Sequence, residues 1–336
     1  MTPPKAAESR CKKSGTCPDF LRKQQAVSCF EIARSAVCCG GPRACTVICD
    51  AADGSSRLFQ YLEVKNLAER YYYSIASGSS GNCGLYMADG TAILIDLGVS
   101  LRKITTALAA LGLALGDIAA VLLTHEHIDH VKGLPMFLKK GRAPVFASRG
   151  TAEALAEKDP LCADRLNVFD CGERFWVRDV DITPFATPHD AAESVGYILE
   201  HGGSRFGFAT DLGFVPRDAA ECLRGCEAVV LESNHDPHML QAGPYPYSLK
   251  MRVAGPAGHL SNPDCAVFAA DLVKNGARTL ILAHLSEKNN IPELALQQTR
   301  AALRGLPACE VIVAPRERME QPVIFGEEDA SCSLSG

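Results

Sequence analysis

The feature that most constrains this chain is a cluster of ionisable side chains at the end of an apolar run. The run IAAVLL (118–123) predicts a buried strand, and the hexapeptide HEHIDH begins one residue later. Alternate residues of an extended segment point the same way, so His125 and His127 can converge on one ion, while Asp129 and His130 lie where the chain turns. Because imidazole and carboxylate groups bind zinc and similar divalent metals, the pattern predicts a metal site rather than a solvated polar run.

Four further polar residues also follow predicted strands. Asp96 ends the run TAILI, His189 follows ITPFATP, Asp211 follows RFGFAT and His284 follows TLILA. Taken alone, a histidine at a strand end is more often a hydrogen-bonded structural residue than a ligand. Taken together with the first cluster, these residues supply about as many groups as a two-metal site needs, including a carboxylate able to bridge the ions.

The order of predicted elements favours an α+β fold. Short apolar runs come in clusters with helices between the clusters, and they do not alternate strictly with helices. Two mixed sheets packed face to face, with helices on the outer faces (an αββα sandwich), accommodate this order best. The strands are expected at 71–76, 91–95, 118–123, 145–147, 166–169, 175–177, 180–185, 195–199, 205–209, 228–231 and 280–283, and the helices at 101–111, 151–157, 263–274 and 292–303.

Composition divides the chain of 336 residues into unequal parts. Residues 1–66 hold ten Lys or Arg, six acidic residues and seven of the 15 cysteines, and they contain no C-x-x-C pair. We expect 1–66 to be a Cys-rich basic extension, disordered or foreign to the natural fold, 67–325 to be the folded domain, and 326–336 to be a flexible tail. The odd cysteine number and the lack of an apolar leader favour a reduced, cytoplasmic protein without a membrane span.

Net charge also bears on the partners of this chain. The formal charge is −5, so no overall basic field attracts nucleic acid, and such a substrate would be held by local cations or bound metal. Lys250 and Arg252, just before the segment GHLSN, could follow a substrate backbone or only form a solvated face.

The sequence resembles the metallo-β-lactamase fold superfamily over about residues 70–320. The pattern of that superfamily is an Asp at a strand end, H-x-H-x-D-H, and then His, Asp and His at later strand ends, all of which this chain contains. Within the superfamily, the segments SIASGSSGNC, TPHDAAESVGY, LESNHD, GHLSN and LAHLSEKNN resemble the YycJ/WalJ-like exonuclease branch. That branch is associated with exonuclease activity on single-stranded DNA, and it lacks the additional substrate-binding domains of related nucleases.

The resemblance implies a site with two divalent metal ions, Zn²⁺ or Mn²⁺. Asp96 is expected outside the ligand set, where hydrogen bonds to the HEHIDH loop would brace it. The implied ligands are His125, His127 and His189 for one ion and Asp129, His130 and His284 for the other, with Asp211 bridging.

Two cations a few Å apart predict a mechanism. A water that bridges them would lose a proton near neutral pH and attack a phosphodiester as a hydroxide, oriented by Asp129 or Asp211. The departing oxygen needs an acid, for which His235 and His259 are available. We favour His259, because it precedes a helix expected to be capped by Asn262, where free N–H groups favour a phosphate. Either histidine could instead hydrogen-bond a loop carbonyl.

The substrate is less constrained by the sequence. We expect Ser79, Asn82, Lys132, Ser261 and Asn262 to contact it, although the loop that holds Ser79 and Asn82 could equally be a structural turn. Single-stranded DNA is the expected substrate, with RNA as a variant. The main alternative is hydrolysis of a small ester, thioester or lactone, as in glyoxalase II-like enzymes, because fold alone does not fix function. A metal-binding protein without turnover is disfavoured by the complete ligand set.

Overall fold

The computed structural model describes residues 49–50, 56–57 and 70–326. Contacts divide the chain into two units, Met1–Lys65 and Asn66–Gly336. In the first unit, the described residues form one antiparallel pair, β1 (Cys49–Asp50) with β2 (Ser56–Arg57). Apart from these residues and Gly326, the predicted extension and tail lie outside the described part of the chain. The second unit carries the fold.

The first sheet of this unit begins as an antiparallel meander and continues with parallel strands. The meander consists of β3 (Arg70–Ala76), β4 (Cys83–Ala88) and β5 (Thr91–Ile95), and β6 (Ile118–Leu122), β7 (Val145–Ser148) and β8 (Leu166–Phe169) follow in parallel. Strand β16 (Val323–Ile324) pairs with the free edge of β3. The connecting helical segments are α2 (Leu101–Ala110), η1 (Leu115–Asp117), α3 (Ile128–Val131), α4 (Leu134–Lys140), α5 (Arg149–Lys158) and α6 (Pro160–Arg165).

The second sheet repeats this plan. An antiparallel meander of β9 (Phe175–Val177), β10 (Val180–Ala186), β11 (Val195–His201) and β12 (Ser204–Ala209) is followed by the parallel strands β13 (Ala228–Glu232), β14 (Thr279–Ala283) and β15 (Glu310–Val313). Its helices are α7 (Arg217–Leu223), α8 (Pro237–Ala242), α9 (Tyr247–Val253), α10 (Asn262–Lys274) and α11 (Pro292–Ala302).

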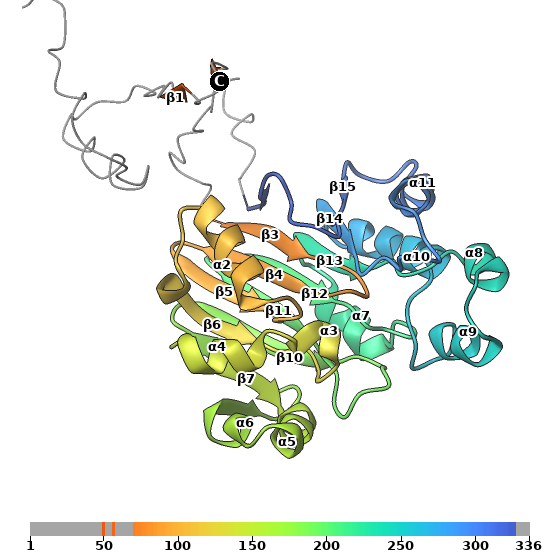
Figure 1. Ribbon diagram of the computed structural model, residues 1–336. Helices are drawn as coiled ribbons and strands as arrows, with labels where there is room; N and C mark the ends of the chain where they lie inside the picture. The colour runs from red at the N-terminus through yellow and green to blue at the C-terminus, as the bar shows by residue number, and fades with distance from the viewer. Residues whose placement is uncertain (1–48, 51–55, 58–69, 327–336) are drawn as a thin grey trace, which may run out of the picture. The chain divides into compact units, whose positions relative to one another are not determined.

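The two sheets pack face to face with helices outside, which confirms the predicted αββα sandwich (Figure 1). Aromatic rings join the sheets in the core. Phe206 of the second sheet stacks on Tyr72 of the first at 5.5 Å between ring centroids and lies 5.2 Å from Tyr86. Such aromatic pairs contribute about 0.5–1.5 kcal/mol beyond the burial of their area.

Burial on both faces explains the continuous apolar runs of the central strands. Every residue of β5, β13 and β14 is buried, because one face of each strand meets the opposite sheet and the other meets helices. The predicted helix at 101–111 and strand at 118–123 correspond to α2 and β6, and η1 lies between them. Over the described residues, no helix has the length and apolar character that crossing a membrane requires.

Candidate metal centre

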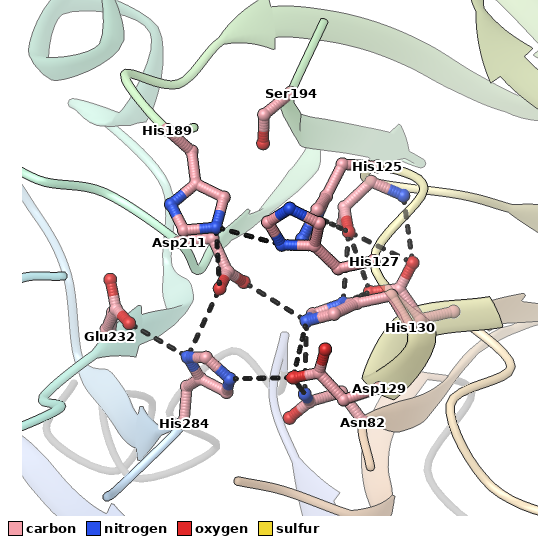
Figure 2. Close-up of polar contacts among 12 residues, drawn as sticks. Asn82, His125, His127, Asp129, His130, His189, Ser194, Asp211, Glu232 and His284 are labelled. Atoms are coloured by element: carbon pink, nitrogen blue, oxygen red, sulfur yellow. Dashed lines mark hydrogen bonds and ion pairs between the residues drawn. The ribbon is translucent and has the colours of Figure 1, made fainter. Parts of the chain in front are cut away.

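Polar side chains from both sheets meet at one end of the sandwich. They lie in the loops that follow β5 and β6 of the first sheet and β10, β12 and β14 of the second, so the carboxyl ends of strands bring them together. Figure 2 shows seven of these side chains facing one another: His125, His127, Asp129, His130, His189, Asp211 and His284.

Three histidines form the first group. His125, His127 and His189 each offer a ring nitrogen, and these atoms all lie within 4.8 Å of one another. The backbone carbonyl of Gly258 lies 3.0 Å from Nδ1 of His189, which turns Nε2 of that ring toward the other histidines. Nε2 of His189 lies 3.3 Å from Nδ1 of His127. The arrangement presents three imidazole nitrogens to one point.

The second group contains Asp129, His130 and His284, whose ligand atoms also lie within 4.8 Å of one another. Asp96 orients His130, because its Oδ2 lies 2.7 Å from Nδ1 of that ring. The other oxygen of Asp96 accepts from the backbone N–H of Thr124 at 2.8 Å. Nε2 of His130 is therefore the nitrogen left to face the site, 3.6 Å from the Asp129 carboxylate.

Asp211 lies between the two groups. Its Oδ1 is 3.7 Å from Nε2 of His189 in the first group, and its Oδ2 is 3.5 Å from Nε2 of His130 in the second. The side chain is 1% exposed, and Oδ2 has no hydrogen-bond partner. A carboxylate in this position can contact both groups at once.

Sequence reasoning assigned no role to Glu232, which the structure places directly behind the site. Its Oε1 accepts from Nδ1 of His284 and from Nδ1 of His259, both at 2.8 Å, and its Oε2 accepts from the N–H groups of Leu212 and Leu260. Four donors already occupy this buried carboxylate, so we do not count it among the ligands although it lies close enough. The sequence feature that could have identified Glu232 is its position as the last residue of the apolar strand AVVLE.

Three residues of the site have a backbone conformation that side chains rarely adopt. The φ angles of Asp96, Asp211 and His284 are 62°, 60° and 56°, in the left-handed region. Each follows the last residue of its strand, or lies two residues beyond it, so the chain turns sharply where the side chain must enter the site. The conformation costs about 1–2 kcal/mol per residue, and such strain clusters at functional sites.

The carboxylates favour positive charge at this position. Burial opposes the shift, but Asp211 and Asp96 raise the pKa of His130 to about 9, and Asp211, Asp129 and Glu232 raise the pKa of His284 well above its usual value. Despite burial, the pKa of Asp129 is lowered by His284 and His130. Without metal, protons on these imidazoles therefore balance the charge of the carboxylates.

The donor set fits divalent cations. Nε2 of His125, Nε2 of His284 and Oδ2 of Asp211 are buried without a hydrogen-bond partner, although an unsatisfied buried polar group costs about 1–3 kcal/mol. Cations would satisfy all three atoms. Five imidazoles with two carboxylates suit zinc, and they also suit other divalent first-row metals such as manganese.

A cleft of about 160 Å³ opens onto these groups. Of the two histidines proposed as acids, one lines this cleft and the other does not. His259 lines the cleft, with its ring 5.0 Å from that of His189 and 5.1 Å from that of His284. His235 is 3% exposed and is not among the lining residues. The lining residues are Ser79, His127, Asp129, His189, Asp190, Asp211, Leu249, Arg252, Val253, Gly258, His259 and His284.

The residues predicted to contact substrate do not share one position. Ser79 is exposed and lines the cleft, whereas Asn82 is buried beside the metal groups, with its Nδ2 3.1 Å from Nε2 of His130. Lys132 is exposed at the end of α3 and does not line the cleft. Two of the five predicted contacts therefore lie at the metal groups or the cleft.

The predicted cap of α10 is wrong by one residue. Ser261 is the N-cap, and its Oγ accepts from the N–H of Asp264 at 3.2 Å, so this side chain serves the helix rather than the cleft. Asn262 is the first helical residue and is completely buried, and its Oδ1 accepts from Ser233 and Asn290. It has no surface to offer a substrate, contrary to the expectation.

Comparison with known proteins agrees with this geometry. A family described as a β-lactamase superfamily domain matches residues 91–285, which span the strands that carry the site. The chain belongs to the metallo-β-lactamase superfamily. Within it, the chain is 34% identical to Exodeoxyribonuclease YycJ of Bacillus anthracis over 226 residues, 67% of this chain and 86% of that protein. It is also 34% identical to Exodeoxyribonuclease WalJ of Streptococcus pneumoniae, over 67% of this chain and 84% of that protein.

Solved structures show the same metallo-β-lactamase fold. YhfI from Bacillus subtilis, a metallo-β-lactamase fold protein, superposes with a TM-score of 0.56 at 15% identity and covers 74% of this chain and 98% of its own. Zn²⁺-bound PqqB from Methylobacterium extorquens superposes with a TM-score of 0.54 at 18% identity, and the match covers 75% of this chain and 100% of that protein. The predicted resemblance, including the YycJ/WalJ-like branch, is confirmed.

Proposed function

We propose that this chain is a metal-dependent phosphodiesterase that removes nucleotides from an end of single-stranded DNA. The observation that carries the proposal is the convergence of seven ligand-type side chains from two sheets on one cleft. The YycJ and WalJ relatives support the choice of substrate, because both are named exodeoxyribonucleases and the chain matches most of the length of each.

We assign two cation positions to the two groups of side chains. His125, His127 and His189 would hold one ion, and Asp129, His130 and His284 would hold the other, with Asp211 touching both. Divalent cations at these positions would supply Lewis acidity, lowering the pKa of water and neutralising charge on a phosphodiester. Zn²⁺ and Mn²⁺ both suit the donors.

The remaining steps fall to side chains of the chain itself. The Asp129 and Asp211 carboxylates accept hydrogen bonds from the attacking water and orient it. His259 donates a proton to the departing oxygen: Glu232 engages its Nδ1, so Nε2 is the nitrogen that faces the substrate. Glu232 holds the ring of His259 in place through Nδ1, as Asp96 holds the ring of His130.

A substrate panel tests the proposal. Purified protein would be incubated with 5′-labelled single-stranded DNA, the matching RNA, duplex DNA, a thioester and a chromogenic β-lactam, each with and without chelator. We expect stepwise shortening of single-stranded DNA that the chelator abolishes. Intact DNA together with a consumed thioester would refute the nuclease assignment in favour of small-ester hydrolysis, and degradation of RNA alone would change the substrate.

The role of His259 has its own test. The variant His259→Ala should lower turnover while its metal content stays unchanged, because the ring stands outside both proposed ligand groups and its shortest polar contact is with Glu232. Metal content is measured by elemental analysis of the purified variant. Loss of metal would instead identify His259 as a ligand.

A further inference from the structure

Arg252, near the end of α9, is the single Lys or Arg side chain that lines the cleft in the described part of the chain. It shares the cleft with Asp190, the residue after His189. Nε of Arg252 donates a hydrogen bond to Oδ2 of Asp190, and the two side chains are 59% and 31% exposed. The two side chains form an ion pair that is open to solvent.

The loop that follows α9 is tied to the other wall of the cleft. The N–H of Asp190 donates to the carbonyl of Ala257 at 3.0 Å, and the carbonyl of Gly258 lies 3.0 Å from Nδ1 of His189. These contacts join the segment after Arg252 to a histidine of the metal centre, so the position of the arginine is fixed relative to that centre.

The same loop ties α9 to His259. The N–H of His259 donates to the carbonyl of Val253 at 2.9 Å. Gly258 makes this approach feasible, because a Cβ atom there would lie 2.2 Å from the carbonyl oxygen of Arg252. Arg252 thus stands on a backbone anchored to both His189 and His259, which line the same cleft.

The cleft is rich in carboxylates, so the positive charge of Arg252 matters for binding of an anionic substrate. Three carboxylates line the cleft, those of Asp129, Asp190 and Asp211, and they repel an anionic substrate. Bound cations would offset Asp129 and Asp211, whereas Asp190 lies outside both metal groups. The guanidinium has five N–H donors in a planar fork, and the contact with Asp190 engages the one on Nε, which leaves donors free for phosphate oxygens.

We propose that Arg252 is a phosphate-binding residue that selects anionic substrates, and that Asp190 holds its guanidinium in position through Nε while the remaining N–H donors bind phosphate oxygens. This inference rests on the proposed function and deepens it, since it names the side chain that distinguishes a phosphodiester from a neutral ester. Arginine suits this role because its fork matches the geometry of phosphate oxygens. Asp190 also lowers the affinity, because it competes with the phosphate for the same cation.

The test compares binding of a fluorescent, phosphorothioate-linked oligothymidylate, which resists hydrolysis, by the metal-loaded wild type and its variants. Arg252→Met should weaken binding about tenfold to a hundredfold. It should also reduce the slope of log affinity against log salt by about 0.7, the loss of one phosphate contact on a single strand. Asp190→Asn should tighten binding about threefold, since it removes an exposed competing charge. The double variant should still bind more weakly than the wild type, because the loss from Arg252→Met exceeds the gain from Asp190→Asn.

Arg149→Met is the matched control, because Arg149 is equally exposed at 60% and pairs with Asp170 away from the cleft. Its affinity and salt slope should equal those of the wild type. Metal content is measured for every variant, since Asp190 adjoins His189.

Two outcomes separate this inference from the proposed function. If the wild type degrades DNA and Arg252→Met binds it as tightly with the same salt slope, the assignment of Arg252 is wrong. If the wild type neither binds nor degrades nucleic acid but hydrolyses a neutral thioester, the proposed function fails. In that case Arg252→Met would hydrolyse the thioester at the wild-type rate.

Discussion

Replacement of Glu232 by glutamine tests the hydrogen-bond network behind the metal centre. The carboxylate accepts from four donors: the two backbone N–H groups of Leu212 and Leu260, and Nδ1 of His259 and of His284. A glutamine has one acceptor oxygen and one NH₂ group. In either orientation of its amide, two donors face the NH₂ group, so Glu232→Gln cannot satisfy the site although it preserves the shape of the side chain.

The magnitude follows from the two bonds that are lost. A hydrogen bond to a charged group contributes about 1.5–3 kcal/mol. The loss of two such bonds should therefore lower the free energy of unfolding of the variant by about 3–6 kcal/mol. Part of this loss disappears if the imidazoles move their protons to Nε2, but Nε2 of His284 then cannot bind a metal. At 1.36 kcal/mol per tenfold change, a remaining loss of about 3 kcal/mol lowers metal affinity roughly a hundredfold.

Metal affinity would be measured by calorimetric titration of chelator-treated protein, and the free energy of unfolding by urea denaturation of the metal-free form. Glu200→Gln is the control, because Glu200 lies in the same sheet and pairs with Arg174 and Arg205 near the surface. Surface ion pairs contribute about 0–1 kcal/mol, so this change should be small. If Glu232→Gln keeps wild-type metal affinity and stability, the carboxylate does not orient the two imidazoles.

Three further predictions concern neighbouring contacts. Asp96→Asn should lower metal affinity about tenfold to a hundredfold by loosening His130, measured by competition with a coloured chelator, and an unchanged affinity would contradict the role of Asp96. Gly98→Ala should destabilise the protein by more than about 3 kcal/mol in urea, because the added Cβ would lie 1.6 Å from the carbonyl oxygen of Asp129, and a variant as stable as the wild type would show that this contact relaxes. The raised pKa of His130, about 9 against 6.5, stabilises the metal-free fold fully below pH 6.5, and this contribution is lost as the pH rises through 9. The melting temperature of metal-free protein should fall over that range while that of metal-loaded protein should not, and a flat profile for the metal-free form would oppose this account.

The sequence predicted the central strands well because their residues are buried on both faces. The run at 91–95 matches the central strand β5 at both ends, the runs at 166–169 and 175–177 match the edge strands β8 and β9, and the other predicted strands differ by one or two residues. The side chains that follow these strands could also be predicted, since each comes directly after an apolar run. Their convergence followed from the resemblance to a known superfamily, because spacing along the chain does not say which strand ends are neighbours.

Other elements could not be read from periodicity. Strand β4 contains Gly84 and is buried throughout, so it shows no alternation of polar and apolar residues. Helices α7, α8 and α9 have six or seven residues each, too few for a helical pattern to emerge. Glu232 escaped notice because it contacts His259 and His284 rather than an ion, and such a partnership appears only in three dimensions.

The distribution of the metal-binding groups over both halves of the sandwich has a consequence for synthesis of the protein. The first half of the chain carries His125, His127, Asp129 and His130, and the remaining three groups arrive later, the last of them His284. A nascent chain that ends before β14 therefore contains His125, His127, His189 and Asp211 but lacks His284, so its second group of side chains is incomplete. The second ion of the proposed pair can meet its full set of side chains only after β14 has been synthesised and has paired within the second sheet.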